Sequence, residues 1–177
     1  MMILLGFTGF LRYDELSKIM YDDINFFNTY MKVFIEKSNT DIYRDGKWVT
    51  ICKGNSEVCP VVNLKRYLEL GKVKKKQYIF RGITKSKYSE RLRKKNCPLS
   101  YTRAREIILQ TCESIGLNKK QFGTHSLRSG GASMAANAGV PDRLFKRHGR
   151  WLTDRAKDMY VQDNVEELLT VTRMMCL

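Results

Sequence analysis

The spacing of the apolar residues changes character only once along this chain, and that change most constrains the fold. Met31, Val33 and Ile35 recur at every second position, which is the period of a β-strand. Residues 48–51 are rich in residue types that favour strands, and the polar residues 39–46 between the two runs favour a turn. Elsewhere the apolar residues follow helical spacing. The sequence therefore predicts a mainly α-helical domain with a small antiparallel β-sheet, an α+β fold.

Start and stop signals divide the rest of the chain into helices. Residues 3–21 predict two helices, because glycines at positions 6 and 9 interrupt the apolar pattern and the second helix begins at about Tyr13. Pro60 favours a helix start, and Gly71 marks its end after Leu70. Start and stop residues predict four more helices, over residues 101–115, 125–138, 142–148 and 154–160, and an amphipathic pattern predicts a last one over residues 165–175.

Length and composition limit the domain organisation. A chain of 177 residues with 43% apolar and 11% aromatic residues forms one domain, or two small ones at most, and is too apolar for intrinsic disorder. The apolar start at residues 1–5 is too short to span a bilayer and lacks the features of a signal peptide. The chain begins inside an apolar helical pattern, so we expect residues 1–177 to be one domain of a longer protein.

The charge is strongly basic. Lys and Arg number 32 against 18 Asp and Glu, a net charge of +14, which favours a polyanionic partner such as nucleic acid. Residues 72–95 hold eleven Lys or Arg and one acid. This segment is either a solvated loop or a surface that contacts the DNA backbone. We expect the second, through Lys72, Lys74, Lys75, Lys76, Lys85, Lys87, Arg91, Arg93, Lys94 and Lys95.

The cysteines do not favour a metal site. There are five, an odd number, and no two have the C-x-x-C spacing of a zinc ligand pair. Free thiols are typical of a reducing, intracellular compartment. We therefore predict no metal and no other cofactor.

Residues 124–130, Thr-His-Ser-Leu-Arg-Ser-Gly, open one of the predicted helices. His125 and Arg128 are three residues apart, so both lie on one face near the helix N-terminus, where a phosphate is favoured. A guanidinium can bind phosphate oxygens in bidentate fashion, and a neutral imidazole can accept a proton. The alternative is a solvated arginine beside a histidine that bonds a local carbonyl.

Two further blocks accompany this pair. Residues 9–16 place Arg12 just after the glycine break with Glu15 three residues later, and residues 148–151, His-Gly-Arg-Trp, precede Tyr160. In this order and spacing the blocks resemble the catalytic domain of the tyrosine recombinases, the integrase family. In detail, residues 38–46 and 124–160 are most similar to the eukaryotic Crypton and DIRS-like mobile-element recombinases. The resemblance extends from about residue 7 to 161, and it implies that residues 1–177 are a catalytic domain without the N-terminal DNA-binding domain of the family.

The resemblance implies roles for individual residues. Arg12 matches the first catalytic arginine of the family, Glu15 the acid that supports it, and His125 and Arg128 the His-x-x-Arg pair. Two arginine forks would stabilise the negative charge that develops on the attacked phosphate, so the cleavage is expected to be metal-independent.

The nucleophile and its neighbour follow from the same resemblance. Trp151 stands where the family has His or Trp, and Tyr160, nine residues later, has the spacing of the nucleophile. Trp151 could instead be only a core aromatic residue, and Tyr160 only a half-buried one. His148 lies three residues before the expected position, so it is interpreted as a helix-end or DNA-contact residue.

The general acid departs from the pattern. In the family a lysine at the turn of the small sheet is thought to protonate the leaving oxygen, but Asn39 occupies that position of the mobile-element pattern. Lys37 precedes it by two residues, faces the same side of a regular strand, and aligns with the Xer-type pattern. Lys37 is therefore the predicted general acid.

The resemblance implies site-specific cleavage and rejoining of double-stranded DNA through a 3′-phosphotyrosyl intermediate, by a tetramer, during integration of a mobile element. We expect the nucleus if the source is eukaryotic, and otherwise the cytoplasm. Two alternatives stay open, a domesticated DNA-binding module that has lost catalysis and a type IB topoisomerase-like enzyme. The apolar stripe of the last helix is expected either to pack on a neighbouring protomer or to fold back; it comprises Val165, Leu168, Leu169 and Val171.

Overall fold

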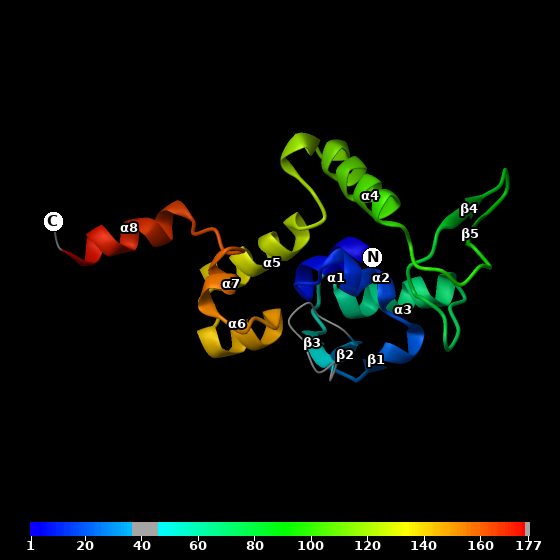
Figure 1. Ribbon diagram of the computed structural model, residues 1–177, viewed down its shortest axis with the longest axis horizontal. Helices are drawn as coiled ribbons and strands as arrows, with labels where there is room; N and C mark the ends of the chain where they lie inside the picture. The colour runs from blue at the N-terminus through cyan, green and yellow to red at the C-terminus, as the bar shows by residue number, and fades with distance from the viewer. Residues whose placement is uncertain (37–45, 176–177) are drawn as a thin grey trace.

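The computed structural model describes residues 1–36 and 46–175 of the chain, and helices make up most of this part (Figure 1). The helices, in chain order, are α1 (Met2–Thr8), α2 (Tyr13–Lys18), α3 (Pro60–Leu70), α4 (Tyr101–Ser114), α5 (Ser126–Asn137), α6 (Asp142–Gly149), α7 (Asp154–Asp158) and α8 (Val165–Met174). Each predicted helix is present, so the mainly helical α+β prediction is confirmed. Among the described residues, none of the helices has the length and apolar character of a membrane span.

The predicted sheet is also present, with one strand more than expected. Strands β1 (Ile24–Phe26), β2 (Tyr30–Ile35) and β3 (Lys47–Cys52) form an antiparallel sheet in the order β1-β2-β3. In β2 every second residue is buried, as the alternation predicts, and Val33 pairs with the buried Val49. β1 has three residues, too few to give a period.

The main core lies between this sheet and helices α1, α2 and α3. Its fully buried side chains include Leu5, Leu11, Leu64 and Val33, which come from four different segments of the chain. α3 begins at its proline and ends before Gly71, as predicted. These elements hold the start of α2 against the rest of the domain.

A second, smaller cluster joins the C-terminal helices to this core. Phe10, Ala132, Phe145 and Trp151 are buried against one another, and Phe10 comes from the turn between α1 and α2. α5 packs closely on α1. Phe10 therefore connects the α1–α2 turn to the part of the chain at residues 132–151.

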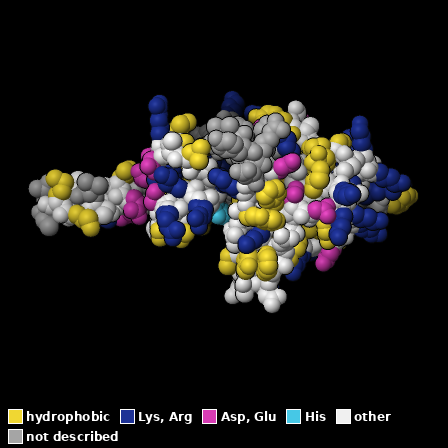
Figure 2. Space-filling model, turned by 60° about the horizontal axis from the view of Figure 1, so that its bottom comes forward, with side chains coloured by type: hydrophobic (Ala, Val, Ile, Leu, Met, Phe, Trp, Pro, Cys, Tyr) yellow, Lys and Arg dark blue, Asp and Glu magenta, His cyan; other side chains and the backbone are white. Residues whose placement is uncertain are grey.

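The basic segment forms a small hairpin that the sequence did not predict. Strands β4 (Ile83–Lys85) and β5 (Glu90–Leu92) pair antiparallel at the end of the molecule opposite α8 (Figure 1). All ten Lys and Arg side chains expected to contact DNA are exposed. Figure 2 shows many Lys and Arg side chains gathered at this end of the molecule.

α8 extends away from the body of the domain (Figure 1). Val165, Leu168 and Leu169 are 68%, 59% and 40% exposed, so the helix leaves apolar side chains in contact with solvent. In this structure α8 is not folded back onto its own domain.

The contact between α1 and α5 depends on Gly131. A Cβ atom there would lie 2.1 Å from the backbone oxygen of Phe7 and 3.0 Å from a ring carbon of Phe10. We expect Gly131→Ala to lower the free energy of unfolding by about 1–3 kcal/mol, the usual cost of overpacking, although alanine favours helices. Chemical denaturation of this variant measures the loss. Gly54→Ala is the control, since nothing lies within 4 Å of its Cβ position; equal stability of Gly131→Ala and the wild type would contradict the packing.

Candidate active site

The turn between α1 and α2 positions Arg12. Phe10 has a left-handed backbone (φ 49°), and Arg12, the N-cap residue of α2, is extended. The backbone N–H of Arg12 donates a hydrogen bond to Oε2 of Glu15 (2.7 Å), which is a common way to satisfy a helix N-terminus. The side chain of Arg12 is 19% exposed, the most of the three arginines near Glu15.

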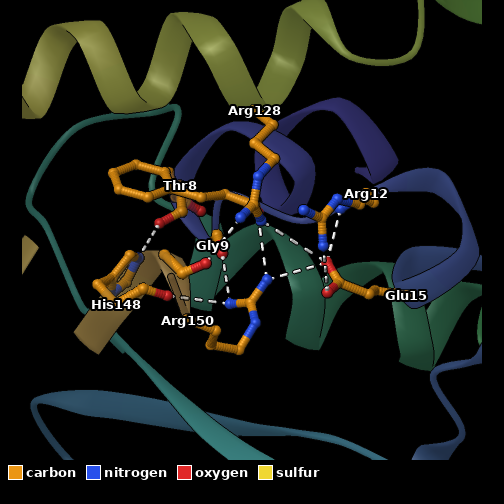
Figure 3. Close-up of polar contacts among 9 residues, drawn as sticks. Thr8, Gly9, Arg12, Glu15, Arg128, His148 and Arg150 are labelled. Atoms are coloured by element: carbon orange, nitrogen blue, oxygen red, sulfur yellow. Dashed lines mark hydrogen bonds and ion pairs between the residues drawn. The ribbon is translucent and has the colours of Figure 1, made fainter. Parts of the chain in front are cut away.

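Glu15 is buried among three arginines (Figure 3). Its Oε2 accepts a hydrogen bond from Nη2 of Arg150 at 2.9 Å and lies 4.0 Å from Nη1 of Arg128. Its Oε1 lies 3.8 Å from Nη1 of Arg12. One carboxylate and three guanidinium groups leave this cluster with a net positive charge, which suits an anionic ligand.

Arg128 is the largest fully buried side chain among the described residues. Its Nη2 donates to the backbone oxygen of Gly149 (2.7 Å), and its Nη1 donates to that of Phe10. Burial, followed by the charges of Arg12 and Arg150, lowers the pKa of Arg128 to about 10. The guanidinium therefore remains charged at neutral pH.

Tyr160 lies beside Arg128. Its ring centre is 4.9 Å from the guanidinium carbon of Arg128, within the range of a cation–π contact. The backbone oxygen of Tyr160 accepts hydrogen bonds from the hydroxyls of Ser129 (2.9 Å) and Ser133 (3.3 Å), both on α5. α7 ends at Asp158, two residues earlier than predicted, so Tyr160 follows the helix and α5 holds its backbone.

Trp151 packs against the same guanidinium. Its ring centre is 4.7 Å from the guanidinium carbon of Arg128 and 5.8 Å from the ring centre of Tyr160. Trp151 is 6% exposed, and its Nε1 has no hydrogen-bond partner among the described residues. A Cβ at Gly149 would lie 1.9 Å from the Trp151 ring, so only glycine fits there. Trp151 is thus a core aromatic residue that also lines the site.

The two histidines lie in different surroundings. His125 precedes α5 as its N-cap residue and is exposed, whereas Arg128 on the same helix is buried. His148 lies in the last turn of α6, where its Nε2 donates to the backbone oxygen of Thr8 (2.8 Å). Its ring packs edge-on against Phe10. His148 is therefore a helix-end residue that faces the protein.

Not every predicted residue comes to this site. Lys37 and Asn39 lie outside the described residues, so the predicted general acid stays a prediction. The basic segment, residues 72–95, includes the β4–β5 hairpin, which lies far from α7 (Figure 1). The described residues contain no group of three or more His, Cys, Asp or Glu that could hold a metal ion.

Sequence reasoning did not assign a role to Arg150. This residue makes the shortest ion pair of Glu15 and is buried. Its side chain also donates to backbone oxygens of the turn at residues 9 and 10 (Figure 3). One feature of the sequence could have indicated a role: Arg150 lies in the His-Gly-Arg-Trp block, directly before Trp151.

The fold and this arrangement define a class of protein. A mainly helical domain gathers three arginines around one buried glutamate, and a tryptophan and a tyrosine pack on one of these arginines. This is the architecture of a tyrosine recombinase catalytic domain. The Phage integrase family profile matches residues 1–167. The chain belongs to this family.

A curated relative agrees with this assignment. An "Integrase/recombinase xerD homolog" of Selenomonas ruminantium is 30% identical over 175 residues, which is 98% of this chain and 50% of that protein. The chain thus spans about half the length of this curated relative. The likeness to the Crypton and DIRS-like groups is not among these findings.

Solved structures share the fold. The XerH site-specific recombinase bound to a palindromic difH substrate, in a post-cleavage complex, has a TM-score of 0.72 at 16% identity and covers 99% of this chain and 44% of its own. The XerA recombinase has a TM-score of 0.67 at 18% identity, and the match covers 97% of this chain and 55% of the XerA chain. A lambda integrase dimer bound to a COC' core site has a TM-score of 0.59 at 16% identity, and the match covers 92% of this chain and 41% of the integrase chain.

His148 should make the fold sensitive to acid. Burial first, and then the charges of Arg150 and Arg128, lower the pKa of His148, although its hydrogen bond to Thr8 opposes the shift. The unfolded chain then binds a proton more readily than the folded one. The contribution of His148 to stability is complete above about pH 6.5 and is lost as the pH falls toward the lowered pKa.

The melting temperature between pH 8 and pH 5 measures this contribution. We expect His148→Gln to reduce the acid-induced decrease seen in the wild type, and His125→Gln, at the other histidine of the chain, to leave it unchanged. An equal decrease in His148→Gln and the wild type would show that other groups cause it.

Proposed function

We propose that this chain is a catalytic domain, residues 1–177, that cleaves and rejoins double-stranded DNA at specific sites through a covalent bond to Tyr160. The observation that carries the proposal is the position of Tyr160, whose ring lies 4.9 Å from a buried arginine of the Glu15 cluster. A tyrosine has a pKa near 10 and reacts slowly unless its anion is stabilised. In this proposal the positive charge of Arg128 lies close to the ring that makes the attack.

The arginines act on the phosphate. When a phosphodiester is attacked, negative charge develops on its non-bridging oxygens, and fixed cationic donors stabilise that charge. Arg12 offers a partly exposed guanidinium. Arg128 has five N–H donors, and its Nε has no partner among the described residues. These two groups take the place of metal ions, so the chemical step needs no metal.

Proton transfer completes the step. The Tyr160 oxygen bonds to phosphorus and gives its proton to His125, which is exposed at the N-terminus of α5. The 5′ oxygen leaves with a proton from Lys37. The product is a 3′-phosphotyrosyl bond and a free 5′-hydroxyl. Because the bond energy is kept in the protein–DNA link, a second 5′-hydroxyl can reverse the reaction without ATP.

Tyr160→Phe should abolish covalent capture of a nicked suicide DNA substrate and leave non-covalent binding unchanged, because only the phenol oxygen is lost. SDS gel electrophoresis detects the adduct. The exposed Tyr101→Phe is the control and should still form it, also in EDTA. An adduct formed by Tyr160→Phe would exclude this nucleophile, and a strict requirement for Mg²⁺ would exclude the metal-independent mechanism.

We further propose that the basic segment, residues 72–95, contacts the DNA backbone. Its ten expected contact residues are exposed, and Figure 2 shows many Lys and Arg side chains gathered at one end of the molecule. One of them, Lys85, pairs with Glu90 (2.8 Å), so the segment keeps a large excess of positive charge. Such contacts raise affinity for all sequences alike.

Replacing Lys72, Lys74, Lys75 and Lys76 by Gln should weaken binding to unrelated DNA sequences equally. For each lysine–phosphate interaction that the substitutions remove, the slope of log K against log salt should decrease by about 0.9. Fluorescence anisotropy at several salt concentrations measures the slope. Arginine at the same four positions keeps the charge and should keep the slope; an unchanged slope in the Gln variant would identify a solvated loop.

For assembly, we propose a tetramer on DNA in which α8 packs on a neighbouring protomer. The exposed apolar side chains of α8 and its extension from the domain support this arrangement (Figure 1). Residues 162–164 link α8 to the tyrosine, so its docking can couple assembly to the position of the nucleophile.

Leu168→Asp combined with Leu169→Asp should leave the melting temperature of the DNA-free chain nearly unchanged, since both side chains are exposed. The same variant should lose assembly on DNA and strand exchange, measured by native gels and a recombination assay. The control is Thr170→Asp combined with Thr172→Asp, which adds the same charge to the same helix. A large decrease in the melting temperature would instead place these leucines in the core of their own domain.

We propose integration of a mobile element as the biological context, and a position near the Crypton and DIRS-like groups; both rest on the sequence blocks at residues 38–46 and 124–160. Its DNA substrate implies an intracellular site, the nucleus in a eukaryote. The competing functions are separated by experiment. A topoisomerase-like enzyme would relax supercoils without strand exchange, and a DNA-binding module without catalysis would form no adduct.

A further inference from the structure

Arg150 occupies a backbone conformation that arginine rarely adopts. It follows α6 as its C-cap residue with φ 59° and ψ 32°, in the left-handed region where glycine or asparagine is usual. Its side chain is nevertheless buried, with 2% exposed. A buried charge is costly unless it is paired, so the interactions of this side chain must offset both burial and backbone conformation.

Its ion pair with Glu15 is the closest of three. The Nη2 to Oε2 distance is 2.9 Å, a hydrogen-bonded ion pair, whereas Arg12 and Arg128 approach the same carboxylate only to 3.8 and 4.0 Å. Arg150 therefore has the strongest direct interaction with the one negative charge of this cluster.

The same guanidinium holds the turn that carries Arg12. Nη1 donates to the backbone oxygens of Gly9 (3.2 Å) and His148 (3.0 Å), and Nη2 also donates to that of Phe10 (3.2 Å). Figure 3 shows this side chain between the α1–α2 turn and the end of α6. Movement of Arg150 would displace the turn before α2.

These contacts give the three arginines different roles toward Glu15. If Arg150 neutralises Glu15, the other two arginines keep their positive charge for an external anion. If Glu15 lacked this partner, its buried carboxylate would attract Arg12 and Arg128, the nearest remaining cations, away from a phosphate.

We propose that Arg150 is a positioning residue that neutralises Glu15, and thereby keeps Arg12 and Arg128 directed at the scissile phosphate. The catalytic part of this inference rests on the proposed function, but the pairing does not. The two parts are therefore tested separately.

The first test is a pair of double-mutant cycles on the DNA-free chain, read by chemical denaturation. Glu15→Gln and Arg150→Gln should be strongly non-additive, with a coupling of about tenfold or more in the unfolding equilibrium constant. Glu15→Gln and Arg12→Gln should add to within about threefold. If Arg150→Gln does not fold, Arg150→Lys replaces it. Stronger coupling of Glu15 to Arg12 than to Arg150 would overturn the assignment.

The second test is single-turnover formation of the covalent adduct. Arg150→Gln should slow the step about tenfold or more while the Kd for DNA stays within about threefold, because the side chain of Arg150 is buried. The double variant Glu15→Gln/Arg150→Gln should recover much of the rate, and Arg150→Lys, which keeps the charge, should lose less than Arg150→Gln.

The outcomes separate the inference from the proposed function. Equal rate losses in all three variants, without recovery, would mean that Arg150 is only structural and would overturn the positioning role. A wild-type chain that forms no adduct would contradict the proposed function. In that case the stability cycles still decide which arginine pairs with Glu15.

Discussion

The buried carboxylate of Glu15 is the interaction on which the rest of the site depends. It lies on α2, and its partners Arg128 and Arg150 lie more than a hundred residues later in the sequence, on α5 and directly after α6. Removing one partner from such a buried cluster leaves an uncompensated charge, which typically costs several kcal/mol. The cluster therefore links the sheet-bearing part of the domain to α5, whose serines hold the backbone of Tyr160.

Burial fixes the orientation of the arginine side chains in this site. Arg128 is held by backbone oxygens of Phe10 and Gly149 and by the rings of Trp151 and Tyr160, so its guanidinium has one defined position. Arg12 lies at the solvent side of the same cluster. A phosphate entering from solvent would meet Arg12 first, with Arg128 behind it. Preorganised charge of this kind stabilises a transition state without reorganising around it.

Much of this architecture could be predicted from local signals. Pro60 and Gly71 mark the ends of α3 because each acts through its own backbone, and the two-residue period of β2 predicts its buried face. The hairpin of β4 and β5 could not be predicted, since each strand has three exposed or half-exposed residues in a highly charged segment. β1 is equally short.

The site divides in the same way. The family resemblance implied one site made of seven residues: Arg12, Glu15, Lys37, His125, Arg128, Trp151 and Tyr160. The structure brings five of them into one region, namely Arg12, Glu15, Arg128, Trp151 and Tyr160. His125 is exposed at the start of α5, and Lys37 lies outside the described residues. Burial of Arg128 and pairing of Arg150 with Glu15 depend on a left-handed residue and on packing between α1 and α5, which no local pattern encodes. The catalytic roles of the predicted site residues, including Lys37, remain proposals.

The central claim is that Tyr160 forms a bond to the 3′ phosphate of cleaved DNA, and peptide mapping tests it most directly. The chain would be trapped on a nicked suicide duplex, digested with protease and nuclease, and analysed by tandem mass spectrometry. Our account predicts one modified peptide, with the nucleotide attached to Tyr160 through its 3′ phosphate. Attachment at another residue, or through a 5′ phosphate, would contradict it.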